Sequence, residues 1–287
     1  MTDLHHARVW ITGAGGLIGH QLALTAPEGA AGCQLAALTH EQLDLLDFQE
    51  VRRRFQRERP ALILHCAALS RTQDCEANPA LARNLNVQAT ALLAELATDA
   101  RLVFFSSDLV FDGRTGHYGE SAPVNPLSLY AETKVAAERL VLSHPRHLVV
   151  RTSINAGVSL GGRRAFNEEM RHAWEAGRTL SLFTDEFRSP IAAEVTARAV
   201  WELAARAQPG LYHVAGSERL SRWQIGQLLA ARWPQLKPRL VPASLRDFVG
   251  PPRPPDTSLD CAKAQALLSF RLPGLTEWLA QHPQALF

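Results

Sequence analysis

Short apolar runs alternate with amphipathic stretches through the first half of the chain. We predict that the apolar runs are strands: Arg8–Thr12, Gln34–Leu38, Ala61–Cys66, Leu102–Ser106 and Leu148–Arg151. Several are apolar almost throughout, as expected for a parallel sheet covered on both faces. Between them, apolar residues recur at helical spacing, as at Phe48, Val51 and Phe55. This alternation predicts βαβ units and an α/β fold with a doubly wound parallel sheet.

The second half of the chain is less regular. Helical patterns cover Phe166–Ala176, Ala193–Ala207 and Trp223–Trp233, and Leu211–Ala215 has the pattern of one more strand. A cluster of prolines between residues 251 and 255 predicts a loop.

Composition narrows the class of protein. The chain has 287 residues, 46% of them hydrophobic, which suits one large α/β unit or two joined parts with a sizeable core. The formal net charge is +2 with both signs interspersed, so the sequence carries no electrostatic footprint for nucleic acid. No apolar run approaches the roughly 18 residues needed to cross a bilayer. We also expect no signal peptide, because the first predicted strand follows closely on the first residues given.

The cysteines match no zinc or redox spacing. They are Cys33, Cys66, Cys75 and Cys261. We therefore expect reduced thiols, no metal site and a cytoplasmic location. From the charge and the apolar runs described above, we expect no nucleic-acid partner and no membrane partner.

A glycine-rich turn follows the first predicted strand and precedes a helical pattern. Its spacing is Gly13-x-x-Gly16-x-x-Gly19, with Leu17 and Ile18 in the last interval. In this setting the first glycine permits a tight turn, the second lets the backbone approach a pyrophosphate, and the third lets the helix pack on the strand. The phosphates are expected at the helix N-terminus, where unpaired N–H groups favour negative charge. A P-loop is disfavoured because no Gly-Lys-Ser/Thr follows.

The position of the turn suggests that the chain has a cofactor-binding part followed by a substrate-binding part. We predict that residues 1–152 form a dinucleotide-binding Rossmann domain. Residues 153–287 are expected to form a smaller C-terminal α/β part that binds substrate. Elements within residues 193–216 are expected to return to the main sheet.

The end of the second strand bears on which nicotinamide cofactor is bound. An NAD site usually carries an acid here that holds the ribose hydroxyls, but this strand runs into Thr39-His40. His40 either faces a 2′-phosphate or is an ordinary surface histidine, and the missing acid favours NADPH over NADH. Asp44 and Leu45 either read an adenine edge or form a turn and helix N-cap.

Tyr130 and Lys134 stand four residues apart at the start of a helical pattern, so their side chains share one helix face. The strand before them ends at Ser106-Ser107. Ligands of a doubly wound sheet bind at the carboxyl ends of its strands. Ser107 is therefore expected to face the same crevice as the glycine turn.

Reduction of a ketone suits these residue types, because it delivers hydride to carbon and a proton to oxygen. The proton donor should have a pKa near the working pH. A free tyrosine titrates at about 10, and a nearby ammonium favours the phenolate and lowers that pKa. We expect Tyr130 to donate the proton, Lys134 to lower its pKa and hold ribose hydroxyls, and Ser107 to hydrogen-bond the carbonyl oxygen.

Other residues at strand ends are expected to contact the cofactor. Cys66, Ala67 and Ala68 follow the third strand, and Ser106 ends the fourth. His65 lies near the same crevice, and we interpret it as an ordinary strand-end histidine.

Together these motifs resemble those of extended short-chain dehydrogenases/reductases. The run Ser106-Ser107-Asp108-Leu109-Val110-Phe111-Asp112-Gly113 resembles the Ser-Thr-Asp-Tyr-Val-Phe-Asp-Gly signature of dTDP-4-dehydrorhamnose reductases. Matching segments continue across nearly the whole chain: Tyr118-Gly119-Glu120, Arg151-Thr152-Ser153, Gly210-Leu211-Tyr212-His213, Arg253-Pro254 and Ser258-Leu259-Asp260. Asn86 resembles the asparagine of extended members, which places it with the cofactor and the active-site lysine.

The resemblance implies NAD(P)H-dependent reduction of the 4-keto group of a nucleotide-linked 6-deoxy sugar, with Tyr130 as the acid. Asp108 and Leu109 are then expected to adjoin the substrate, with Leu109 where the family has a tyrosine. Residues 185–191 depart from the family's Asp-Gln-x-Gly-x-Pro-Thr by losing a glycine and gaining charge. Arg188 and Arg253 are candidates for the substrate diphosphate, because arginine suits bidentate phosphate recognition. The alternative for each is a solvated surface arginine.

Two other functions stay open at this point. One is another extended short-chain enzyme, such as a sugar-nucleotide epimerase or dehydratase, although a dehydratase is expected to have a glutamate after Asp108. The other is a non-catalytic NADP-binding regulatory subunit resembling the beta subunit of methionine adenosyltransferase. The intact Ser107, Tyr130 and Lys134 set argues for catalysis. Members of the family often form homodimers, so a homodimer is a further expectation.

Overall fold

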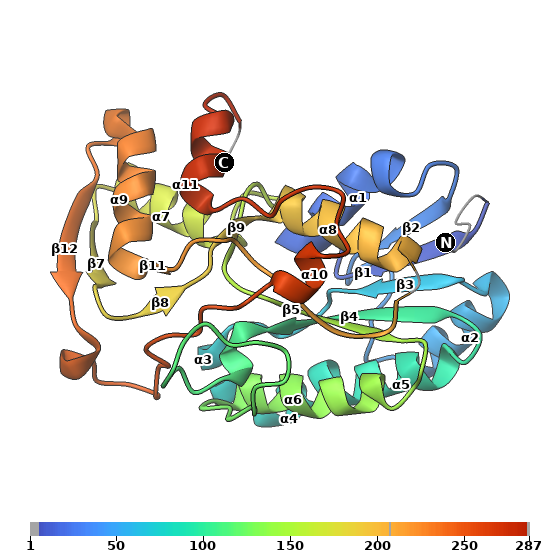
Figure 1. Ribbon diagram of the computed structural model, residues 1–287. Helices are drawn as coiled ribbons and strands as arrows, with labels where there is room; N and C mark the ends of the chain where they lie inside the picture. Colours follow the sequence, from blue (N-terminus) through green and yellow to red (C-terminus); the bar gives the residue numbers. More distant parts are fainter. Residues whose placement is uncertain (1–5, 207, 286–287) are drawn as a thin grey trace.

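The computed structural model describes residues 6–206 and 208–285, and its centre is a six-stranded parallel sheet (Figure 1). Each neighbouring pair of strands in the sheet is parallel. From one edge to the other, the strands are β10 (Gly210–Val214), β5 (Leu148–Thr152), β4 (Arg101–Ser107), β3 (Leu62–His65), β1 (Arg8–Thr12) and β2 (Gln34–Leu38). The chain starts at the inner strand β1, adds β2 at one edge, and then adds β3, β4, β5 and β10 toward the other edge. This order confirms the predicted doubly wound α/β class.

Helices cover both faces of this sheet (Figure 1). On one face, α1 (Leu17–Gly29) packs against α8 (Ala193–Arg206). The opposite face carries α2 (Phe48–Glu58), α5 (Ala89–Leu96) and α6 (Leu129–Leu142). Shorter helices lead into α5 and α6: α3 (Thr72–Ala77), α4 (Pro79–Arg83), a π-helical turn η1 (Asn84–Gln88) and the 3-10 turn η2 (Asp108–Val110).

Coverage on both faces explains why the strands are apolar throughout. In β4, Val103 and Phe105 join the core under α1 and α8, while Leu102 and Phe104 join the core under α5 and α6. Successive strand residues point to opposite faces, so a doubly covered strand has no polar face.

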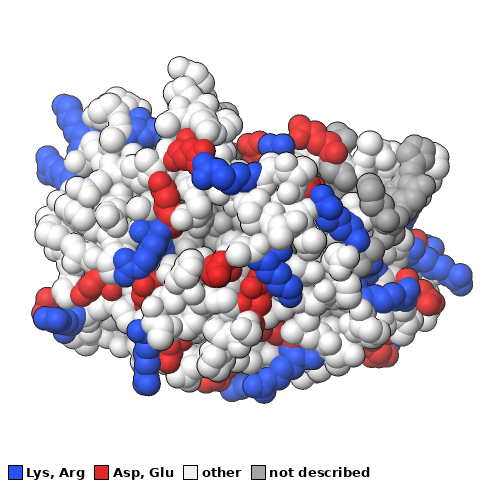
Figure 2. Space-filling view, viewed as in Figure 1, with Lys and Arg blue, Asp and Glu red and all other residues white. Residues whose placement is uncertain are grey.

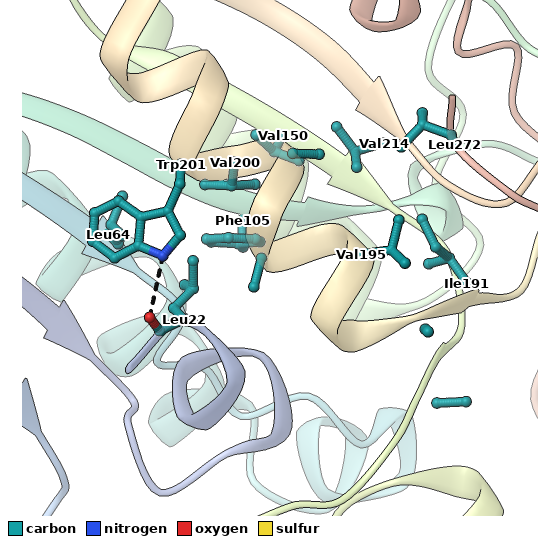
Figure 3. Packing of buried hydrophobic residues seen from close by; sticks show 14 of the residues in the cluster. Leu22, Leu64, Phe105, Val150, Ile191, Val195, Val200, Trp201, Val214 and Leu272 are labelled. Carbon is teal, nitrogen blue, oxygen red and sulfur yellow. Dashed lines mark hydrogen bonds between the residues drawn. The ribbon is translucent and has the colours of Figure 1, made fainter. Parts of the chain in front are cut away.

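Trp201, a residue of α8, packs in the core that this helix forms with α1 and the sheet (Figure 3). It is 1% exposed, and its indole N–H donates to the Leu22 carbonyl at 3.1 Å. This bond joins α8 to α1 across nearly 180 residues of sequence.

The C-terminal part adds small sheets and helices beside the main sheet. The paired strands are β7 (Thr179–Phe183) with β12 (Arg239–Ala243), β8 (Phe187–Arg188) with β11 (Leu220–Ser221), and β6 (Asn155–Ala156) with β9 (Ile191–Ala192). The helical segments are α7 (Phe166–Glu175), α9 (Arg222–Arg232), η3 (Pro234–Leu236), η4 (Leu245–Asp247), α10 (Ala262–Gln265) and α11 (Leu275–Gln281). Both α8 and β10 belong to the main sheet layers. The division into two domains stays a prediction.

The expected strands and long helices are present, and their described ends agree with the predictions to within one residue. The predicted end of one helix at Ala207 lies outside the described residues. On the face shown in Figure 2, basic and acidic side chains are intermixed. Within residues 6–206 and 208–285, no helix has the length and apolar content needed to cross a bilayer.

Candidate active site

The carboxyl ends of β1, β3, β4 and β5 open onto one cleft of about 1210 Å³. It lies outside the point between β1 and β3 where the winding of the chain reverses, which is where doubly wound sheets bind ligands. The glycine turn lines this cleft together with Ser107, Tyr130 and Lys134. The two motifs that the sequence pointed to therefore face one space.

The glycine turn is shaped for a backbone-bound phosphate. Gly13 has φ +70°, and a Cβ there would lie 2.6 Å from the Ala67 nitrogen. At Gly19 a Cβ would lie 2.4 Å from the Gly13 oxygen, so neither position accepts a side chain. Gly16 is the N-cap of α1, with no side-chain cap and no acid in the first turn. The free N–H groups at the start of α1 and the helix dipole favour binding of an anion there. These residues fit a dinucleotide pyrophosphate.

Most of the predicted cofactor residues line the cleft. They are Gly13, Gly16, Leu17, Ile18, Gly19, Thr39, His40, Leu45, Cys66, Ala67, Ala68, Ser106, Tyr130 and Lys134. Asp44 and Asn86 are not among the lining residues. The Asp44 carboxylate accepts the Leu46 N–H at 2.9 Å, as in the turn alternative. Asn86 is buried behind the cleft wall.

The three candidate catalytic residues come from the end of β4 and the start of α6. The Ser128 hydroxyl caps α6 by accepting the Ala131 N–H, so Tyr130 falls in the first turn and Lys134 one turn later. The Ser107 hydroxyl lies close enough to Tyr130 to affect the pKa of that phenol. All three are less than 9% exposed.

Burial sets the charge states of this group. It raises the pKa of Tyr130, and the Ser107 hydroxyl and the Arg188 charge only partly oppose the rise. Burial lowers the pKa of Lys134 to about 8. The Lys134 ammonium donates to the Phe105 carbonyl at 2.8 Å and lies 5.9 Å from the centre of the Tyr130 ring. We expected Lys134 to lower the pKa of Tyr130, whereas the net shift here is upward because desolvation of the phenolate dominates.

Asp108 is fully buried and its carboxylate is saturated with donors. Arg188 donates to both of its oxygens, with Nε at 2.6 Å from Oδ2, and Ser153 donates to Oδ2 at 2.6 Å. Further hydroxyl donors are Ser107 at 3.1 Å and Thr257 at 3.3 Å. Asp108 does not line the cleft, whereas Leu109 and Arg188 do. A carboxylate held this way is poorly suited to acid or base catalysis.

Arg188 belongs to a cluster of three arginines around Glu186, and all four residues line the cleft. Glu186 is 2% exposed and accepts Arg222 Nε at 2.9 Å and Arg253 Nε at 2.8 Å. Burial alone would raise the pKa of Glu186, but the arginines lower it to about 2. The Arg253 guanidinium also lies 5.5 Å from the centre of the Phe248 ring. Three arginines around one glutamate leave this part of the cleft lining net positive, and we call the cluster the cationic wall.

Sequence reasoning placed Arg188 and Arg253 here but missed other lining residues. These are Arg222, Glu186 and Phe248, together with a rim formed by Arg71, Arg163, Arg164, Phe166 and Glu169. Glu186 could have been suspected from its departure from the family pattern. No local pattern marks Arg222, which meets Glu186 only because β11 pairs with β8.

Comparison with known proteins identifies the family. The RmlD substrate binding domain family matches residues 7–286. The chain belongs to this family. The crystal structure of dTDP-4-dehydrorhamnose reductase from Bacillus anthracis in complex with NADP is similar, with a TM-score of 0.87 and 25% identity over 96% of this chain and 98% of that one.

Curated relatives point in two directions. Methionine adenosyltransferase 2 subunit beta from Danio rerio is 30% identical over 275 residues, which is 91% of this chain and 85% of the relative. The spore coat polysaccharide biosynthesis protein SpsK from Bacillus subtilis is 31% identical over 215 residues, covering 73% of this chain and 74% of the relative. The comparisons confirm the predicted membership of the extended short-chain dehydrogenases/reductases and the prediction of a nicotinamide-dependent oxidoreductase.

Proposed function

We propose that the protein is a cytoplasmic NADPH-dependent reductase of the 4-keto group of a nucleotide-linked 6-deoxy sugar. The observation that carries this proposal is the meeting of Ser107, Tyr130 and Lys134 with the glycine turn in one cleft. Similarity to dTDP-4-dehydrorhamnose reductases supports the choice of substrate class.

The side chains of the cleft suit proton delivery to a carbonyl. The reduced nicotinamide, when bound, supplies the hydride. Tyr130 is protonated at neutral pH because burial raises its pKa, and it is the proton donor to the carbonyl oxygen. Ser107 donates a hydrogen bond to the same oxygen as negative charge develops there. Lys134 binds the ribose hydroxyls.

The cationic wall suits the phosphates of a nucleotide sugar. Arg222 and Arg253 present guanidinium groups beside the space that Tyr130 faces, and such groups bind phosphate through two parallel hydrogen bonds. Asp108 is held by Arg188, which disfavours a dehydratase that needs a free carboxyl group at this position.

NADPH is the proposed cofactor because the end of β2 offers no carboxylate to the cleft. Thr39 and His40 line the cleft at the end of β2 instead. Neither residue repels a 2′-phosphate.

The test is cofactor oxidation by the purified protein with a dTDP-4-keto-6-deoxy sugar, followed by nicotinamide absorbance with NADPH and with NADH. We expect faster oxidation with NADPH and a loss of about 10²–10⁴-fold in kcat for Tyr130→Phe, with unchanged binding of NADP⁺. Equal rates for the wild type and Tyr130→Phe would contradict the assignment of the proton donor. Faster oxidation of NADH would overturn the cofactor proposal.

A second candidate is a regulatory NADP-binding subunit, favoured by the 30% identity to methionine adenosyltransferase 2 subunit beta. Its test is sedimentation of the protein with a catalytic methionine adenosyltransferase subunit in the presence of NADP⁺. A stoichiometric complex, together with no turnover of any nucleotide keto-sugar, would replace the reductase proposal.

A further inference from the structure

A row of buried polar side chains runs from the glycine turn to the helix that carries Tyr130. Thr12, the last residue of β1, places its hydroxyl 2.7 Å from Nδ1 of His65 at the end of β3. Nε2 of His65 lies 3.0 Å from the Thr90 hydroxyl in α5. The Thr90 hydroxyl donates to the backbone carbonyl of Asn86 at 2.8 Å.

The row continues from Asn86 to α6. The Asn86 amide donates to the Thr133 hydroxyl at 3.0 Å, and that hydroxyl donates to the Tyr130 carbonyl at 2.7 Å. The same Asn86 side chain pairs with both backbone groups of Leu69, at 2.8 and 3.0 Å, in the loop after β3. Asn86 thus fixes a cleft-lining loop to the catalytic helix.

The geometry selects one tautomer of His65. The Thr90 hydroxyl has a single proton, and it donates that proton in the hydrogen bond to the Asn86 carbonyl. The Thr90 oxygen can therefore only accept a hydrogen bond from His65. His65 therefore carries its proton on Nε2. Its bare Nδ1 accepts the proton of Thr12. In every hydrogen bond of the row, the donor is then the group on the Thr12 side and the acceptor is the group on the Tyr130 side.

No solvent can replace a missing member of the row. His65 and Thr90 are 0% exposed, and Thr12, Asn86 and Thr133 are at most 2% exposed. Burial, with a smaller contribution from Lys134, lowers the pKa of His65 to about 3, so the ring is neutral throughout the physiological range. A buried polar group that loses its partner keeps the full cost of desolvation.

The row passes through the π-helical turn η1, which contains Asn86. Turns of this kind occur mostly as local bulges at functional sites. The Thr90 hydroxyl bonds back to the carbonyl four residues earlier, a contact that tends to bend a helix. His65, at the end of a sheet strand, contacts the same Thr90 hydroxyl and so ties this part of the helix to the sheet.

We propose that His65, as the neutral Nε2–H tautomer, is a positioning residue that holds the catalytic helix at a fixed place relative to the glycine turn. Through Thr90 and Asn86, it sets where Tyr130 stands over the cofactor cleft. The catalytic consequence rests on the proposed reductase function, whereas the tautomer and the placement of α6 do not.

The first test reads the tautomer directly in the unmodified protein. Nitrogen-15 NMR of histidine-labelled protein, with the His65 signals assigned from a His65→Gln variant, should show a protonated Nε2 and a bare Nδ1. We expect this pattern to stay unchanged from pH 5 to pH 9. A proton on Nδ1, or a titration within this range, would overturn the proposal.

The second test replaces the Thr90 hydroxyl by a methyl group and so keeps the shape of the side chain. Thr90→Val should lower kcat for the keto-sugar at least tenfold while KM and the Kd for NADP⁺ change less than twofold, and Thr90→Ser should restore most of the loss. Thr25→Val is the matched control, because Thr25 makes the same bond to the carbonyl four residues earlier in α1, at 2.8 Å, outside the row. Wild-type kcat in folded Thr90→Val, or equal losses in both valine variants, would refute the positioning role.

A third readout needs no substrate. The chain has 3 tyrosines, so carbon-13 labelling of the tyrosine ring gives a resolvable set in which Tyr130 is assigned by Tyr130→Phe. Thr90→Val should shift the Tyr130 signal of the NADP⁺ complex and leave those of Tyr118 and Tyr212 in place. If no keto-sugar is turned over but this shift is present, the function proposal fails and the positioning proposal stands. An unshifted Tyr130 signal would contradict the positioning proposal itself.

Discussion

Tyr130 and Lys134 illustrate how burial governs chemistry at the scale of single residues. Burial disfavours the charged form of each, so the pKa of Tyr130 rises and that of Lys134 falls to about 8. Near neutral pH the tyrosine holds its proton and most of the lysine is still cationic. The pair is thus ready for proton donation in the direction of reduction.

This charge state predicts the pH dependence of catalysis. Lys134 loses its charge as pH rises through about 8, which weakens the ribose contact that we propose for it. We expect kcat/KM for reduction to fall above pH 8, measured from initial rates of NADPH oxidation between pH 6 and 10. In Lys134→Arg, whose charge persists, the residual activity should show no such fall. An identical descending limb in both proteins would show that another group titrates.

Sequence reasoning found Ser107, Tyr130 and Lys134 because their spacing and their position after a strand are local features. It did not find the direction of the Tyr130 pKa shift, since desolvation depends on the walls of the cleft. It also interpreted His65 as an ordinary strand-end residue. The partners of His65 come from β1 and α5, which are distant in sequence.

At the scale of elements, the arginine cluster depends on the pairing of β8 with β11. This pairing brings Arg222 to Glu186, and the loop before residue 256 brings Arg253 to the same carboxylate. Strands of two residues have no periodicity to detect, which explains why sequence analysis missed them. The long strands of the main sheet were predictable because both of their faces are buried.

Arg253 provides a prediction for this cluster. Loss of one charge-assisted contact costs about 1.5–3 kcal/mol, so Arg253→Ala should raise KM for the nucleotide sugar about 10- to 100-fold while kcat changes little. The matched control is Arg219→Ala: Arg219 pairs with Asp256 at 2.6 Å and does not line the cleft. Steady-state kinetics on the two variants would measure kcat and KM for the nucleotide sugar. A similar rise in KM for both would place the phosphates elsewhere.

At the scale of the whole molecule, the cleft depends on a core that joins the first and second halves of the chain. Trp201 packs between α1 and the sheet and ties α8 to α1 through the Leu22 carbonyl (Figure 3). The helix that begins at the glycine turn is thus supported by a residue from the second half of the sequence. Such long-range packing is invisible to local pattern analysis.

Truncation of this side chain should be costly. Trp201→Ala removes a buried aromatic and its hydrogen bond, and we expect it to lower the free energy of unfolding by about 3–5 kcal/mol. Leu24→Ala, on the exposed side of α1 where Leu24 is 58% exposed, should change it by less than about 0.5 kcal/mol. Urea denaturation followed by circular dichroism measures both. Equal effects would show that the α1–α8 packing contributes little to stability.

The most direct test of the proposed reaction follows the hydride itself. NADPH carrying deuterium at either face of the nicotinamide C4 would be incubated with the protein and a dTDP-4-keto-6-deoxy sugar, and the sugar product examined by mass spectrometry and proton NMR. We expect one deuterium at C4 of the sugar from one of the two labelled cofactors, and none with Tyr130→Phe over the same period. A protein that binds NADPH and keto-sugar yet transfers no deuterium to C4 would contradict the reductase assignment.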